Sequence, residues 1–88
     1  MPYIKPELRT DFEKHIVGLQ PETAGDLNYI ISRISADYVA RKGKKYAILN
    51  EVMGVLSAVA HEFYRRVVAP YEDEKIKENG DIKGYGQS

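Results

Sequence analysis

An apolar side chain recurs every three or four residues between Tyr46 and Pro70, and this pattern constrains the fold more than any other feature of the chain. The positions are Leu49, Val52, Leu56, Val59, Phe63 and Val67. Such spacing puts side chains on one face of an α-helix, because a helical turn contains 3.6 residues. The pattern predicts a helix of about 22 residues, roughly 33 Å long at 1.5 Å per residue, which Pro70 closes.

Three further helices are predicted around this one. The first begins at Pro6, ends near Gly18, and has an apolar face formed by Leu8, Phe12, Ile16 and Leu19. The second follows the capping residue Thr23, ends at Gly43, and has an apolar face formed by Leu27, Ile30, Ile31, Ile34 and Tyr38. A short polar helix from Tyr71 to Asn79 ends at Gly80, and a flexible tail covers about 82–88.

These elements predict an all-α fold, a small helical bundle of three main helices plus a short C-terminal helix, in one domain over residues 1–88. A chain of 88 residues buries a modest share of its surface. The first helix is too short to cover the long one, so we expect oligomerisation to complete the bundle. We expect the chain to form a homodimer or higher homo-oligomer, and binding to a different protein partner is the second option.

Composition excludes several classes of function. The chain has no cysteine, which rules out disulfides and thiolate chemistry and favours a cytoplasmic location. Its longest apolar-rich stretch, Val52–Ala60, is far shorter than the roughly 20 residues that a membrane crossing needs. Thirteen basic residues balance thirteen acidic ones, so a general nucleic-acid binder is not indicated. A salt-sensitive nucleic-acid contact at Arg41–Lys45 is a weaker alternative.

Three acidic side chains are candidate metal ligands. Glu51 and Glu62 lie eleven residues apart on the long helix, about 16 Å along one face, and Asp26 on the second helix could join either. Carboxylates on neighbouring helices are the usual ligands of divalent cations in helical bundles. The alternative interpretation is therefore a magnesium-dependent enzyme acting on a nucleotide phosphate. The structural interpretation pairs these carboxylates with Arg33, Arg65 or Arg66 and requires no cofactor.

Other catalytic patterns are incomplete. The segment His61–Arg65 opens like a zinc-protease helix but has arginine where the second histidine should stand. No serine has the flanking glycines of a nucleophile elbow. A non-enzymatic role is favoured over an enzymatic one.

Tyrosine and arginine gather at the end of the long helix. The residues are Tyr64, Arg65, Arg66 and Tyr71. Tyrosine and arginine are enriched in binding hot spots, so this cluster predicts a subunit or partner interface. Packing of the short last helix is the competing interpretation.

Four segments carry a family resemblance: Gly25–Tyr29, Asn50–Leu56, Glu62–Glu72 and Glu78–Asp81. With them the chain resembles an uncharacterised family of short bacterial and phage proteins, a domain of unknown function. The resemblance implies a phage or prophage origin and no particular activity. A looser similarity is to the all-α nucleotide pyrophosphohydrolases, whose helices hold magnesium through acidic residues three apart. Here Glu51 is followed at that spacing by Gly54, and Glu62 by Arg65.

Overall fold

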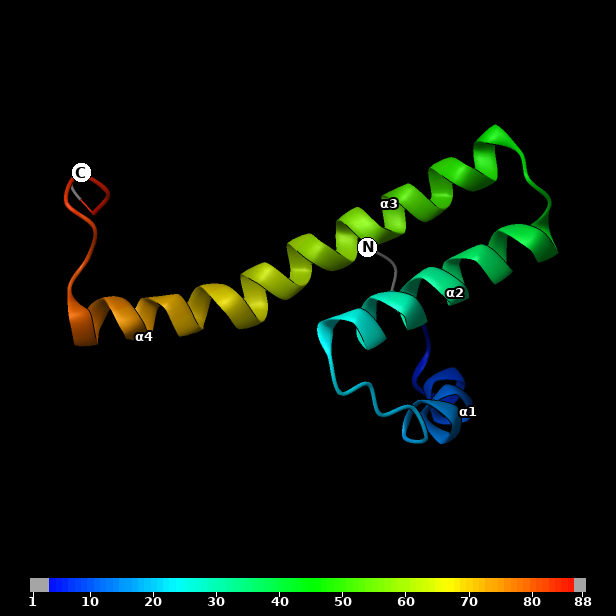
Figure 1. Cartoon of the computed structure of the whole chain (residues 1–88), viewed down its shortest axis with the longest axis horizontal. Helices are drawn as coiled ribbons and strands as arrows, with labels where there is room; N and C mark the ends of the chain where they lie inside the picture. The colour runs from blue at the N-terminus through cyan, green and yellow to red at the C-terminus, as the bar shows by residue number, and fades with distance from the viewer. Residues whose placement is uncertain (1–3, 87–88) are drawn as a thin grey trace. The chain divides into compact units, whose positions relative to one another are not determined.

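The computed structural model describes residues 4–86, and within them the chain is all-α (Figure 1). The elements in chain order are α1 (Pro6–Ile16), α2 (Ala24–Lys42), α3 (Tyr46–Phe63), the π-helical turn η1 (Tyr64–Val68) and α4 (Ala69–Asn79). The predicted fold class is confirmed. The chain divides into two compact units, Met1–Val52 and Met53–Ser88, with the boundary inside α3. The predicted single domain stays a prediction.

Local signals set the helix ends of the first unit. Pro6 occupies the first turn of α1, where a missing N–H costs nothing. Thr23 caps α2, because its hydroxyl oxygen accepts a 3.0 Å hydrogen bond from the backbone N–H of Asp26. Gly43 ends α2 with a φ of 100°, a conformation that glycine adopts without steric cost. The predicted cap and stop of this helix are confirmed.

The predicted end of the long helix at Pro70 is wrong. Helical structure runs without a break from Tyr46 to Asn79, through α3, η1 and α4. In an α-helix a proline ring would clash with the carbonyl four residues earlier. Here the preceding turn is π-helical, and the backbone N–H of Ala69 donates to the carbonyl of Tyr64, five residues back. This wider turn displaces the carbonyls below Pro70, so the proline starts α4 instead of ending the helix.

No side chain is buried among residues 4–86. In the first unit the best-covered apolar side chains are Ile30 and Val39 on α2 and Ile48 and Val52 on α3, all only half-buried. The apolar positions of α1 (Leu8, Phe12 and Ile16) remain exposed. Within the described part of the chain, no helix is both long and apolar enough to span a bilayer. The helices thus form without completing a hydrophobic core.

The predicted flexible tail, about 82–88, follows α4, and its flexibility stays a prediction. Gly80 ends α4 with a φ of 86°, and the backbone N–H of Tyr85 donates to the carbonyl of Ile82 at 3.0 Å, closing a turn. The last two positions of the predicted tail, 87 and 88, lie outside the described residues.

Candidate interaction surface

An exposed apolar stripe follows the second unit from α3 into η1. Leu56, Val59, Phe63 and Val67 form it, with exposed fractions of 38%, 50%, 58% and 52%. Spacings of three and four residues keep side chains on one face of a helix. The sequence predicted this stripe. We refer to these four residues as the apolar stripe.

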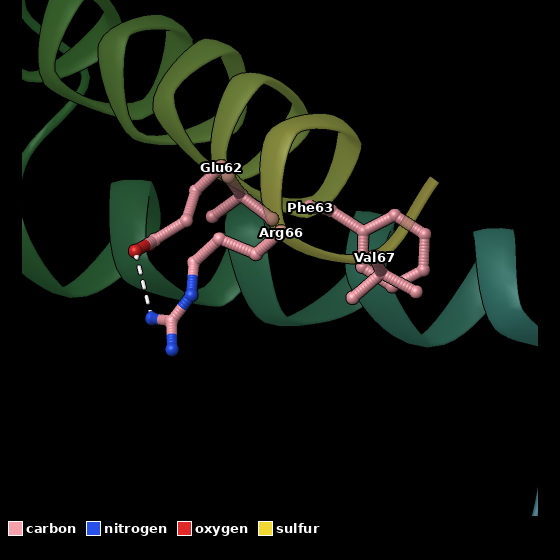
Figure 2. Close-up of a pocket in the computed structure, with 5 residues that line it drawn as sticks. Glu62, Phe63, Arg66 and Val67 are labelled. Atoms are coloured by element: carbon pink, nitrogen blue, oxygen red, sulfur yellow. Dashed lines mark hydrogen bonds and ion pairs between the residues drawn. The ribbon is translucent and has the colours of Figure 1, made fainter. Parts of the chain in front are cut away.

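A shallow hollow lies on the apolar stripe (Figure 2), and its lining residues are Val59, Glu62, Phe63, Arg66 and Val67. Figure 2 shows Glu62 and Arg66 together at one side and Phe63 and Val67 at the other. Four of the five residues stand at positions i, i+3, i+4 and i+7. That is the spacing of the holes that receive side chains of a facing helix in coiled coils.

An ion pair between Glu62 and Arg66 borders the hollow. Arg66 Nη1 lies 3.3 Å from Glu62 Oε2, one helical turn apart. The Glu62 side chain is 23% exposed, against 60% for Arg66, so Glu62 is the better covered partner of the pair. Exposed pairs at this spacing stabilise a helix by about 0.2–0.5 kcal/mol. This pairing is the structural interpretation that the sequence offered for Glu62.

The predicted tyrosine and arginine cluster is divided between two surfaces. Arg66 lines the hollow, whereas Tyr64 and Tyr71 line a second concavity on α4 and the C-terminal turn, together with Tyr85. Arg65 lines neither of these two hollows and is exposed. The interface role of the four residues stays a prediction.

A hydrogen bond spans the π-helical turn. The Tyr64 hydroxyl donates to Glu72 Oε1 at 2.7 Å, from η1 to the first turn of α4. This bond, followed by the negative charge of Glu72, raises the pKa of Tyr64. Sequence reasoning missed it, because the contact joins residues eight positions apart and depends on the geometry of η1.

The three candidate metal ligands each have a local partner. Asp26 accepts a 3.1 Å hydrogen bond from the backbone N–H of Glu22, which with the Thr23 hydroxyl lowers the pKa of that carboxyl. Glu51 accepts from the Tyr38 hydroxyl, and Glu62 pairs with Arg66. Residues 4–86 contain no group of three or more histidine, aspartate or glutamate side chains arranged to hold a metal ion. The magnesium interpretation stays a prediction.

The bond between Tyr38 and Glu51 ties α2 to the start of α3. The Tyr38 hydroxyl lies 2.6 Å from Glu51 Oε1. The sequence assigned Tyr38 only to an apolar face and gave no signal for this contact, since the connection at 43–45 decides which residues of the two helices meet.

We expect the Tyr38 hydroxyl to titrate above the usual value of 10.0, because its hydrogen bond to Glu51 is lost on ionisation. A raised pKa in the folded state means that the bond contributes fully below the unfolded pKa and is lost as pH rises through the folded one. Tyrosinate absorbance of the wild type and of Tyr38→Phe isolates this titration as a difference. A difference curve centred at or below 10.0 would contradict the bond.

The four cations of the segment Arg41–Lys45 are Arg41, Lys42, Lys44 and Lys45, and two of them make local contacts. Arg41 Nε lies 2.8 Å from Asp37 Oδ2, and Lys42 Nζ lies 5.9 Å from the centre of the Tyr38 ring. Two of the four cations predicted as a nucleic-acid contact therefore have partners on α2 itself. The nucleic-acid contact stays a prediction.

Gly54 has open space around it. A Cβ built at this position meets no heavy atom within 4 Å outside the helix backbone and its chain neighbours. We expect Gly54→Ala to stabilise the helix by about 1 kcal/mol, because alanine loses less backbone entropy than glycine in a helix interior. Thermal unfolding followed by circular dichroism measures the change. A lower melting temperature would instead indicate that another helix approaches Gly54.

Comparison with known protein families gives a match over most of the chain. The model of the family described as a domain of unknown function (DUF6899) matches residues 1–82. No curated protein and no solved structure matches the chain. The match covers the whole first unit and residues 53–82 of the second, and it confirms the predicted resemblance to a domain of unknown function.

Proposed function

Since the chain belongs to the DUF6899 family, whose description names no activity, we propose that it is a non-enzymatic interaction module that assembles with copies of itself. The observation that carries the proposal is the combination of an apolar stripe with the lack of any buried side chain in residues 4–86. Each stripe residue is 38–58% exposed, so covering it gains about 1 kcal/mol per side chain.

The second unit by itself cannot cover the stripe. It consists of one helical segment through α3, η1 and α4, followed by a turn. A single helix has no element of its own to pack against its apolar face, whereas helices in proteins gain most of their stability from such packing. The first unit also exposes apolar side chains on α1 and α2, including Phe12 and Ile31. Association of several copies supplies the missing contacts to both units.

The proposed setting is the cytoplasm of a bacterium, in a phage or prophage context. The lack of cysteine supports an intracellular location. The resemblance to short bacterial and phage proteins supports the origin.

Size-exclusion chromatography with light scattering tests the proposal. The purified chain should elute as a dimer or larger species, and the mass should be the same with magnesium and with a chelator. A monomer that persists to about 100 µM, well above a micromolar dissociation constant, would overturn the proposal. A mass that changes with magnesium would return attention to Asp26, Glu51 and Glu62.

A further inference from the structure

We propose that the second unit pairs with the same segment of a second copy in antiparallel orientation, with Phe63 of the two chains meeting near a two-fold axis. Glu62 of each chain then faces Arg66 of the other. This arrangement rests on the proposed self-association and specifies its geometry. Three features of the described residues support it.

The first feature is the fit between the stripe and its own hollow. Val59, Glu62, Phe63 and Arg66 provide a hole of the kind that receives one side chain from a facing helix (Figure 2). Phe63 is the largest side chain of the stripe and lines the same hollow. A two-fold axis beside Phe63 places the Phe63 side chain of each copy next to the hollow of the other copy, as a self-complementary interface requires.

The second feature is the register that two-fold symmetry imposes. In an antiparallel pair the numbers of facing residues have a constant sum. An axis that sets residue 62 against residue 66 fixes this sum at 128. Val59 then lies level with residue 69, about 3 Å along the helix from Val67, and Leu56 lies level with residue 72, about 1.5 Å from Tyr71. Leu56, Val59, Val67 and Tyr71 are all exposed. One register therefore sets the charged positions against each other and keeps the apolar positions within one helical turn of each other.

The third feature is charge, which selects between the two orientations. Arg66 follows Phe63 by three residues and so lies beside the apolar stripe, at a position that faces the partner helix in a coiled coil. A parallel pair would bring Arg66 against the partner's Arg66, and like charges in contact oppose association. An antiparallel pair brings it against Glu62 instead. The existing bond of 3.3 Å between Glu62 and Arg66 shows that both side chains already lie along this border of the hollow.

Spin labels on single cysteines distinguish the orientations, because the native chain has no cysteine. The two sites are Lys77→Cys near the end of α4 and His61→Cys close to the proposed axis. In the antiparallel pair the two labels at 77 stand about 40 Å apart along the helix, since 13 residues separate each from the axis at 1.5 Å per residue. The two labels at 61 lie within about 30 Å, the spacing of packed helices plus two label arms.

Pulsed electron paramagnetic resonance on each labelled variant measures the distance between the two labels of a pair. A distance near 40 Å or longer at 77 with a short one at 61 supports the antiparallel pair. Short distances at both sites would overturn the orientation but leave self-association standing. No distance between chains at either site would overturn self-association as well. Both labelled positions are exposed, and circular dichroism of each labelled variant verifies that its helix content is unchanged.

Discussion

Phe63→Glu is expected to convert the assembled protein into monomers and to raise the dissociation constant at least about 100-fold. The substitution puts a carboxylate in the centre of the apolar stripe, where association would remove it from water. Burial of an unpaired charge costs several kcal/mol, and two-fold symmetry imposes that cost twice. Every 1.4 kcal/mol is a factor of ten in affinity. Sedimentation velocity over a range of concentrations measures the change.

Ser57→Glu is the matched control for this substitution. It adds the same charge to the same helix at an exposed position, about 100° around the helix from Leu56. The control should associate like the wild type. Equal loss of association in both variants would mean that a glutamate anywhere on α3 is disruptive. If both variants still associate like the wild type, the apolar stripe is not the contact surface.

Glu62→Arg and Arg66→Glu should each weaken self-association by about 10-fold or more, and an equimolar mixture of the two should restore it. Each variant alone carries two like charges at the border of the hollow, which face two more of the same sign in a second copy. In the mixture one chain contributes two arginines and the other two glutamates. Every facing pair is then attractive, although each chain retains its internal repulsion.

Native mass spectrometry measures this result directly, because the two variants differ in mass and a mixed pair is identified by its own peak. The internal repulsion between positions 62 and 66 costs only about 0.2–0.5 kcal/mol of helix stability, which is too small to abolish association by unfolding. The double variant, with both substitutions in one chain, should associate with itself. A mixture in which only same-variant species form would contradict an ionic contact between chains.

The helices were predictable because their signals are local. The face of α2 follows from its spacing, and Thr23 and Gly43 mark its ends through bonds and dihedral angles that involve only neighbouring residues. The apolar stripe followed from the same spacing rule. Pro70 misled the prediction because its effect depends on the turn before it. A proline stops an α-helix, yet the π-helical turn at Tyr64–Val68 admits it.

The contacts of the candidate site were less predictable than its residues. Glu62 has the chemistry of a metal ligand and of an ion-pair partner, and the sequence left both open; the structure pairs it with Arg66. The bond from Tyr38 to Glu51 crosses thirteen positions, so it follows only once the connection between α2 and α3 is known. Periodicity identifies which face is apolar, but it does not identify what lies against that face.

A chain with no buried side chain in residues 4–86 depends on its neighbours for protection as well as for stability. If self-association completes the core, the stability of each copy rises with the amount of protein present, as in any obligate oligomer. At low concentration the copies stay unassembled, and proteases degrade such incompletely folded chains first. Expression level then acts as a threshold: below it the protein is cleared, and above it the assembled form persists.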